Sequence, residues 1–329
     1  MTSPALRVEA ITKAFGNHVA VDKVSFEVPR GVVYGILGPN GAGKSTTLRM
    51  INDIIAPDSG KVTVLDGLAP GAAAAKHIGY LPEERGLYPK MKVGEVIEFM
   101  GELRGLTRAE ARKRGGAWLE RLGLGKWTKN KVQDLSKGMQ QKVQFAAALL
   151  HEPDIVILDE PWSGLDPVNA DVLRTTVEEI RDAGRTVLFS THQMEQAEKV
   201  VDALIIIARG KKVLDGKLRD IKRTWQSAGW IALGYTDDDA KHTAEAVLAD
   251  KALIAESRIP DLDHEDDVEV RAADGVAPQK LLSTLIGAGV TLRKFEVIVP
   301  SLHQIFVDKV GPEAAVAERR DETEPERVS

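Results

Sequence analysis

A glycine-rich segment, GPNGAGKST, carries residue types that bind phosphate. It occupies residues 38–46 and follows a short apolar run. Glycines let the backbone turn so that successive N–H groups point inward at phosphate oxygens, and a helix that begins there adds its positive dipole end. Lys44 can bridge the β- and γ-phosphates of a nucleoside triphosphate, and the Ser45 hydroxyl can bind Mg²⁺. The predicted phosphate contacts are Gly38, Pro39, Asn40, Gly41, Ala42, Gly43, Lys44, Ser45 and Thr46.

Two neighbouring acids, Asp159 and Glu160, follow the apolar run at 155–158. At the carboxyl end of a buried strand, Asp159 can reach a phosphate-bound Mg²⁺, usually through water. Glu160 can orient or deprotonate an attacking water. Such a pair alone is more often a helix cap or a solvated loop. In one chain with a phosphate-binding loop, it predicts hydrolysis of a nucleoside triphosphate.

A third motif, LSKGMQQ at 135–141, resembles the LSGGQ signature of the ABC ATPases. Further motifs follow the family order: SGLD at 163–166 resembles the D-loop, and STH at 190–192 resembles the switch histidine. Phe15 stands where the family stacks an aromatic ring on adenine, although a core aromatic is the alternative interpretation. Residues 5 to about 220 contain every element in order, so the chain is identified as a member of this family. The resemblance adds Phe15, Ser136, Lys137, Gly138, Met139, Asp166 and His192 to the expected site.

Two positions depart from the family pattern. Lys137 replaces the first signature glycine, and we expect its side chain to face away from the nucleotide. Glu83 takes the place of the Q-loop glutamine that contacts Mg²⁺ and the attacking water. A carboxylate can still bind Mg²⁺, but it adds negative charge beside the γ-phosphate. Glu84 is the nearest competitor for this role.

The resemblance implies a mechanism as well as a site. Two copies of the chain would form a head-to-tail homodimer around two Mg-ATP, each bound by the phosphate loop of one copy and the Ser136 region of the other. Glu160, His192 and Lys44 would carry the catalysis, and Ser45, Asp159 and Glu83 would bind Mg²⁺. The segment 83–104 resembles the part of the family that receives a coupling helix of the permease, a separate integral-membrane subunit.

The pattern of apolar residues predicts the elements that position these motifs. Residues 6–37 alternate apolar and polar positions as strands do, and a helix is expected at 46–55. Buried strands at 155–158 and 186–190 flank a crossover helix at 171–183, and 139–150 is helical. The fold class is therefore α/β: an ABC cassette of the P-loop NTPase class, with a mixed sheet, N-terminal antiparallel strands and a helical subdomain at about 90–150.

The pattern changes after a linking helix at 217–227. Strands at 230–235, 253–259, 268–271 and 290–299 and helices at 239–249 and 278–288 follow the order β-α-β-β-α-β, which predicts a small ferredoxin-like α+β domain. A closing helix is expected at 301–310. The predicted domains are a cassette at 1–225, an accessory or regulatory domain at 226–310 and a disordered charged tail at 311–329. This second part resembles the accessory domain of bacterial sodium- and drug-exporter ATPases of the ABC-2 type.

Composition narrows the functional classes. The 329 residues include no cysteine, which excludes disulfides and cysteine-bound metal, and the net charge is −5. Nucleic-acid binders usually carry a concentrated basic surface, so we expect no nucleic-acid partner. No secretory signal is visible and no apolar run approaches the roughly 20 residues that span a bilayer. We therefore expect a peripheral protein, held at the cytoplasmic face of the membrane by its permease.

The second hypothesis is a soluble, non-transport ABC ATPase that acts on a macromolecular partner such as DNA or the ribosome. Proteins of that class generally carry two fused cassettes, a coiled coil or zinc-binding cysteines. This chain has one cassette, no cysteine and no sustained heptads. A scaffold for cluster assembly is a third, weaker hypothesis, against which the accessory domain argues.

Overall fold

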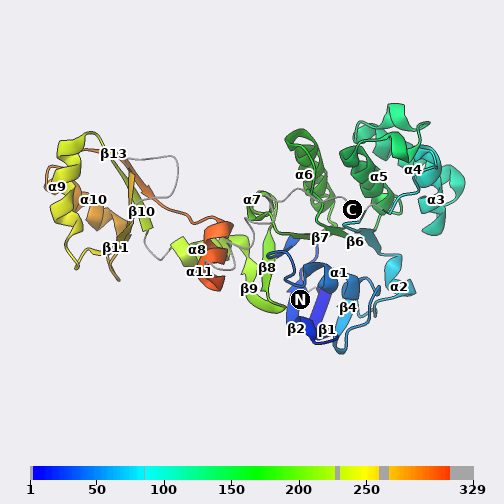
Figure 1. Ribbon diagram of the computed structural model, residues 1–329, viewed down its shortest axis with the longest axis horizontal. Coiled ribbons are helices and arrows are strands. Elements are labelled where there is room, and N and C mark those ends of the chain that lie inside the picture. Colours follow the sequence, from blue (N-terminus) through cyan, green and yellow to red (C-terminus); the bar gives the residue numbers. More distant parts are fainter. Residues whose placement is uncertain (1–2, 85, 227–229, 259–266, 312–329) are drawn as a thin grey trace. The chain divides into compact units, whose positions relative to one another are not determined.

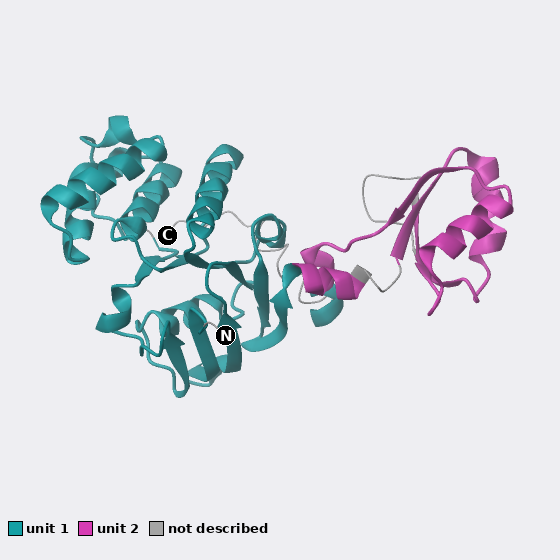
Figure 2. Cartoon of the chain, turned by 180° about the vertical axis from the view of Figure 1, so that it is seen from behind, with its two compact units in different colours: residues 1–218, 306–329 teal, residues 219–305 magenta. Residues whose placement is uncertain are grey.

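A computed structural model describes residues 3–84, 86–226, 230–258 and 267–311 of the chain (Figure 1). It divides into two compact units, residues 1–218 with 306–329 and residues 219–305 (Figure 2). The predicted tail falls almost wholly on residues 312–329, outside the described residues. No described helix is long and apolar enough to cross a membrane.

The centre of the first unit is a six-stranded sheet in the order β5-β6-β7-β3-β8-β9. Five strands are parallel and β9 pairs antiparallel with β8. Strands β3, β6, β7 and β8 are buried at every position, because both faces of the sheet are covered. The strands are β3 (Val33–Leu37), β5 (Ile78–Leu81), β6 (Ile155–Asp159), β7 (Thr186–Thr191), β8 (Ala203–Ala208) and β9 (Lys211–Lys217). The predicted α/β core is confirmed.

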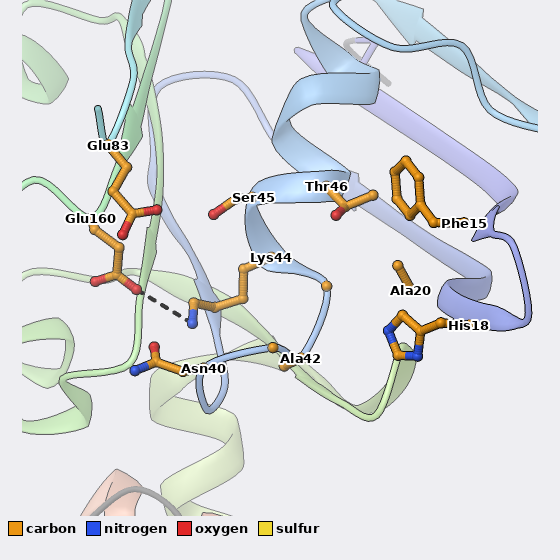
Figure 3. Close-up of a pocket in the computed structure, with 12 residues that line it drawn as sticks. Phe15, His18, Ala20, Asn40, Ala42, Lys44, Ser45, Thr46, Glu83 and Glu160 are labelled. Carbon is orange, nitrogen blue, oxygen red and sulfur yellow. Dashed lines mark ion pairs between the residues drawn. The ribbon is translucent and has the colours of Figure 1, made fainter. Parts of the chain in front are cut away.

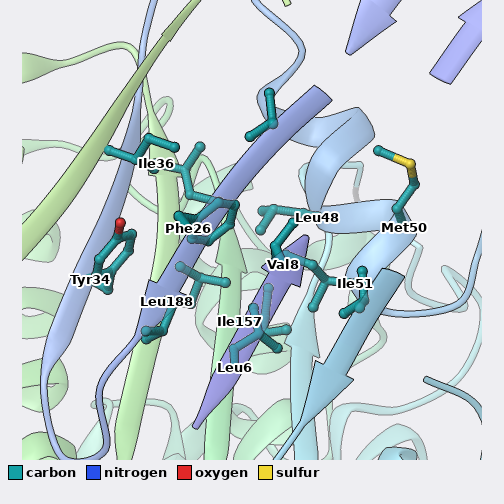
Figure 4. Packing of buried hydrophobic residues seen from close by; sticks show 14 of the residues in the cluster. Leu6, Val8, Phe26, Tyr34, Ile36, Leu48, Met50, Ile51, Ile157 and Leu188 are labelled. Atoms are coloured by element: carbon teal, nitrogen blue, oxygen red, sulfur yellow. The ribbon is translucent and has the colours of Figure 1, made fainter. Parts of the chain in front are cut away.

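A second, antiparallel sheet packs beside the first in the order β2-β1-β4. It consists of β1 (Leu6–Phe15), β2 (His18–Val28) and β4 (Ser59–Val64). Figure 4 shows how apolar side chains from this sheet, from the helix α1 (Lys44–Ile51) and from the parallel strands fill one core. Phe26 stacks on Tyr34 with ring centroids 5.8 Å apart. This core fixes α1, and with it the glycine-rich segment, against the ends of β3, β6 and β7.

Helices cover the parallel sheet and extend beyond it. The helices α6 (Pro167–Asp182) and α7 (Met194–Glu198) lie on the face opposite α1 (Figure 1). The predicted helical subdomain consists mainly of α3 (Val93–Leu103), α4 (Arg108–Arg121) and α5 (Lys137–Leu149), with 3₁₀ turns at Gly125–Trp127 and Val132–Asp134. Buried Glu98 of α3 accepts hydrogen bonds from Arg108 and Arg112 of α4 and so joins these two helices. The short helix α2 (Ala72–Ala75) precedes β5.

Two helices begin earlier than the apolar pattern predicts. Helix α1 starts at Lys44 instead of residue 46, and α6 starts at Pro167 instead of residue 171. Asp166 caps α6, because its carboxylate accepts a hydrogen bond from the Asn169 N–H at 3.0 Å, and proline suits the first helical position. These cap signals, and not the apolar face, mark the true start of α6.

The second unit contains a four-stranded antiparallel sheet in the order β11-β12-β10-β13. With the helices between the strands, the chain order is β-α-β-β-α-β, so the predicted ferredoxin-like arrangement is confirmed. The elements are β10 (Trp230–Tyr235), α9 (Asp238–Leu248), β11 (Ile254–Arg258), β12 (Asp267–Ala272), α10 (Pro278–Gly287) and β13 (Leu292–Val297). Helices α9 and α10 and the sheet share a small apolar core of their own.

The predicted domain boundary at 225/226 differs from the division between the units. The first unit ends at Leu218, where α8 (Leu218–Gln226) begins. The closing helix α11 (Leu302–Val310) is shared between the units, with the boundary before Phe306. The last part of α11 therefore groups with the first unit and not with the accessory domain.

Candidate functional site

A cavity of about 420 Å³ opens beside the glycine-rich segment (Figure 3). Three parts of the chain that are far apart in sequence bound it: the β1–β2 hairpin, the loop into α1, and the ends of β5 and β6. Its lining consists of Phe15, His18, Ala20, Asn40, Gly41, Ala42, Gly43, Lys44, Ser45, Thr46, Glu83 and Glu160. The structure thus brings together the predicted adenine-side residue, most of the predicted phosphate loop and two of the predicted acids.

The loop follows its path because two positions admit only glycine. Gly38 has φ +153°, and a Cβ there would lie 2.0 Å from the Ile207 carbonyl oxygen of β8. Gly43 has φ +102°, and its Cβ would lie 2.3 Å from the Ala20 carbonyl oxygen. The loop therefore lies directly against the neighbouring backbone, as a tight phosphate cradle requires.

Lys44 lies inside this loop and is only 5% exposed. Its Nζ donates to the carbonyl oxygens of Gly38 at 2.8 Å and Pro39 at 3.2 Å, and lies 3.3 Å from Glu160 Oε1. A buried ammonium needs such partners. They hold the charge at the position where phosphate oxygens would enter the cavity.

Asp159 and Ser45 meet at the end of the sheet. The Ser45 Oγ donates to Asp159 Oδ1 at 3.1 Å, and the Ser190 Oγ donates to the same oxygen at 2.5 Å. Burial raises the pKa of Asp159, against the hydrogen bonds from these two serines. The other oxygen, Oδ2, is buried and has no hydrogen-bond partner in the described chain. An unpaired buried carboxylate oxygen next to a serine hydroxyl fits Mg²⁺, which takes one or two protein ligands together with phosphate oxygens and water.

Glu160 is 6% exposed and its carboxylate is held on both oxygens. Lys44 approaches Oε1, while Thr191 Oγ1 and His192 Nδ1 each lie 3.1 Å from Oε2. Burial alone would raise the pKa of Glu160, but the His192 hydrogen bond and the Lys44 charge outweigh it and lower this pKa. Its φ of +46° is unusual for a non-glycine residue, a form of strain that concentrates at functional sites. Glu160 is thus an ionised carboxylate, suited to accept a proton.

The two candidate Q-loop acids differ in position. Glu83 lines the cavity, and its pKa is raised by burial first and then by the charges of Asp159 and Glu160. Glu84 has an 89% exposed side chain that lies 3.9 Å from Arg49 on α1, and it is absent from the cavity lining in the described structure. Geometry therefore favours Glu83 over Glu84.

The remaining predicted residues lie elsewhere. In the described part of the chain, the lining excludes Ser136, Lys137, Gly138, Met139 and Asp166. Ser136 caps α5 by accepting from the Met139 N–H at 3.3 Å, and its side chain is exposed. A Cβ on Gly138 would lie 3.3 Å from the side chain of Leu165, so the signature lies beside the D-loop. In the described chain, the signature therefore does not line the cavity of its own phosphate loop.

Several contacts are not predicted by the sequence. His18 and Ala20 line the cavity, and His18 pairs with Phe15 across the β1–β2 turn. Ser190 and Thr191 bind the two acids, although the motif assigns a role only to His192 of that triplet. The sequence could have indicated His18 as a lining residue, because His18 directly follows the turn that begins at Phe15. Phe15 itself is 52% exposed, which rules out the alternative of a core aromatic.

Comparison with known proteins agrees with this geometry. Residues 21–163 match the ABC transporter family, and residues 216–310 match the C-terminal domain of DrrA1-3-like ATP-binding proteins. The chain is 40% identical over 308 residues to the uncharacterized ABC transporter ATP-binding protein YhaQ of Bacillus subtilis, covering 93% of this chain and 98% of that one. It is 32% identical over 309 residues to the linearmycin resistance ATP-binding protein LnrL of the same organism, covering 93% of this chain and 98% of LnrL.

Solved structures support the same assignment. An ATP-binding subunit of an ABC transporter superposes with a TM-score of 0.62 at 31% identity, covering 67% of this chain and 93% of that one. The ADP conformation of the ATP-binding cassette MJ1267 superposes with a TM-score of 0.58 at 27% identity, covering 67% and 93%. The phosphate cradle, the paired acids and these relatives lead to one conclusion: the chain belongs to the ABC transporter family, as an ATP-binding subunit that hydrolyses ATP.

Proposed function

We propose that two copies of this chain pair head to tail around two Mg-ATP and drive a separate membrane-spanning permease that exports its substrate. The proposal rests on one observation: the predicted site residues lie in two separate places on the chain. Most of the phosphate loop shares one cavity with Glu83 and Glu160, while Ser136 and Asp166 are exposed and lie outside its lining in the described structure. A second copy, turned head to tail, supplies the missing signature.

Within each site, the proposed roles follow from the contacts. The Phe15 ring stacks on adenine, and the loop N–H groups with Lys44 bind the phosphates. Ser45 and Asp159 would hold Mg²⁺, with Glu83 beside them, and the ion would supply positive charge against the β- and γ-phosphates. Glu160 accepts the proton of the attacking water, and His192, 3.1 Å from Glu160, fixes the carboxylate in position.

The permease contact is proposed for the segment 83–104 and its surroundings. Tyr88, Leu103 and Ile54 are large apolar side chains that remain exposed. A second cavity, of about 180 Å³, is lined in part by Ile54, Tyr80 and Arg104. An apolar hollow edged by an arginine suits a short helix of a partner protein. Docking there places the chain on the cytoplasmic face of the membrane.

Export is proposed from the relatives. LnrL is named for linearmycin resistance, and a relative from Ralstonia nicotianae, 37% identical over 253 residues, is a Nod factor export ATP-binding protein. The accessory domain at 226–310 is proposed to regulate or support the dimer. The alternative, a soluble ATPase acting on a macromolecule, draws no support from the net charge of −5 or from these relatives.

The test is reconstitution. The chain is co-expressed with a candidate permease, chosen from the neighbouring genes for its several apolar spans, purified from membranes and assayed in liposomes for ATP hydrolysis and substrate movement. We expect co-purification with the permease, and hydrolysis that disappears in Lys44→Ala while the complex still forms. A chain that never associates with membranes when that protein is present, yet hydrolyses ATP in response to nucleic acid or ribosomes, would overturn the transport proposal.

A further inference from the structure

Two glutamines on one face of α5 reach out to two different loops of the active site. The Gln141 Nε2 donates to the Pro161 carbonyl oxygen at 2.6 Å, and the Gln144 Nε2 donates to the Glu84 carbonyl oxygen at 3.2 Å. They stand three positions apart, so their side chains lie on the same side of the helix. Figure 1 shows α5 beside β6, the strand that leads to Pro161, and α5 also contacts β5, the strand that leads to Glu84.

Each accepting carbonyl belongs to the residue directly after an acid of the site. Pro161 follows Glu160, and Glu84 follows Glu83. Both acids line the nucleotide cavity. The two amides therefore hold the backbone of both acidic loops, and they hold it from a single helix.

Burying these two amide side chains lowers the stability of the fold. Gln144 is 7% exposed and has buried apolar neighbours along α5, such as Val143 and Phe145. The Gln141 Oε1 is buried with no hydrogen-bond partner among the residues described. A buried amide lowers stability unless its hydrogen bonds compensate, and here one amide is only half satisfied. Packing alone would favour methionine or leucine at both positions.

The same helix begins at the signature, because Ser136 caps its N-terminus. An α-helix moves largely as a rigid body, so a displacement of its first turn reaches residues 141 and 144 one to two turns later. A link from signature to acids therefore exists within one chain.

We propose that Gln141 and Gln144 are positioning residues that couple the signature end of α5 to Glu160 and Glu83 of the same chain. When Ser136 meets the nucleotide bound to a second copy, the shift of α5 moves both acidic loops, so each site senses the occupancy of the other. The proposal rests on the shared site proposed above. It predicts that both glutamines affect hydrolysis and leave the first binding of ATP unchanged.

The kinetic test uses the full chain in complex with its permease. Gln144→Met keeps the volume and removes the donor. We expect its kcat to fall about tenfold with little change in KM, the pattern of a lost interaction that matters only for the reaction step. Because Gln144 acts through the Glu83 loop, Gln144→Met should lower kcat by less than about twofold when Glu83→Ala is already present.

A matched control removes a different buried hydrogen bond. Thr176 on α6 is 3% exposed, and its hydroxyl donates to the Val172 carbonyl oxygen at 2.8 Å. Thr176→Val should remain folded and keep the kcat of the wild type, whereas Gln144→Met should remain folded and lose kcat. Variants are compared only after their melting temperatures show that they fold.

A second readout needs no turnover and reports on Gln141. Trp162, next to Pro161, is buried and meets the Phe189 ring edge-on at 4.7 Å. The chain labelled with 5-fluorotryptophan has one ¹⁹F resonance for each tryptophan, and Trp162→Phe assigns the relevant one. Addition of ATP to the complex should shift the Trp162 resonance, and Gln141→Met should remove most of that shift while ATP still binds.

The outcomes separate the two proposals. A wild-type complex without ATP hydrolysis would remove the shared-site function itself. If the wild type hydrolyses ATP, the positioning role fails in either of two cases. In one, Gln144→Met loses no more kcat than Thr176→Val, or loses the same factor with and without Glu83. In the other, the Trp162 resonance responds to ATP equally with Gln141 and with methionine at that position.

Discussion

The carboxylate of Glu160 has more partners than any other acid of the cavity. Lys44, Thr191 and His192 fix both of its oxygens, and its own N–H is bound by the Ser190 carbonyl and hydroxyl. Such fixation lowers its pKa and keeps it ionised at neutral pH, where a general base must be free of its proton. The lysine, hydroxyl and imidazole contacts define one oriented proton acceptor.

Glu160→Gln should therefore separate binding from hydrolysis. The amide keeps the size of the side chain and removes the basic oxygen, so ATP affinity should persist while turnover falls by roughly 10²-fold or more. Nucleotide binding and phosphate release are measured on the permease complex. Glu178→Gln on α6, which removes a carboxylate paired with Arg174 at 3.0 Å on the surface, serves as the control. Near-normal turnover of Glu160→Gln would remove Glu160 from the role of base.

Glu83 gives a prediction about pH. Burial, and then the charges of Asp159 and Glu160, raise the pKa of Glu83. Between the ordinary glutamate pKa and this raised pKa, Glu83 therefore keeps its proton in the folded protein and loses it in the unfolded chain. Without nucleotide, stability should fall as pH rises from the ordinary glutamate pKa through the raised one. Glu83→Gln removes this group, so its melting temperature should exceed that of the wild type at neutral pH and converge with it in acid. A variant that melts lower at neutral pH would contradict this account of Glu83.

At the scale of elements, the loop into α1 depends on contact with β8. In Gly38→Ala, the added Cβ would lie 2.0 Å from the Ile207 carbonyl oxygen, so the loop or the strand must move. Nucleotide affinity should be lost, together with about 2–4 kcal/mol of stability.

Gly123→Ala, which lies after α4 and outside the cavity lining of the described structure, is the control for backbone strain. Gly123 has φ +73°, and a methyl group added there would have no neighbouring atom within 4 Å, so the change should cost only about 1 kcal/mol of stability and leave ATP affinity unchanged. Isothermal titration with ATP and thermal unfolding compare the two variants. A Gly38→Ala variant that binds ATP as well as Gly123→Ala does would contradict the role of the contact with β8.

The sequence predicts those elements whose signals are local. Apolar runs such as 155–158 indicate buried strands, and the glycines of 38–43 indicate a phosphate cradle before a helix. The apolar pattern places the start of α1 two residues late, because Lys44 and Ser45 have no apolar side chains. The hydrogen bonds from Ser190 to Asp159 and from Gln144 to Glu84 join segments that are distant along the chain. No spacing rule specifies such contacts, so they emerge only from the fold.

At the scale of the whole molecule, the chain divides into a cassette with the motifs and a small α+β unit with its own core. Replacing residues 227–300 by a short Gly/Ser linker keeps α8 and α11, part of which groups with the cassette. ATP affinity should be unchanged because every predicted phosphate contact lies before residue 193. Transport by the complex should decline if the unit regulates or supports the dimer. A folded deletion variant that no longer binds ATP would contradict this division.

The head-to-tail arrangement is the central claim at this scale, because the cavity of one copy lacks a signature. Two variants test it: Lys44→Ala disables the phosphate loop, and Gly138→Asp places a carboxylate in the signature. Each is expected to be inactive alone. In a mixed dimer one site combines both lesions, while the other pairs an intact phosphate loop with an intact signature.

The decisive measurement is nucleotide trapping by complexes that contain one copy of each variant, isolated through two different affinity tags. The shared-site account predicts that these mixed complexes trap ATP at one site per dimer, above either parent, with partial hydrolysis if one site suffices. If Ser136 and Gly138 served the phosphate loop of their own chain, no mixture would contain an intact site. Mixed complexes that form but trap no more nucleotide than the parents would contradict the head-to-tail mechanism.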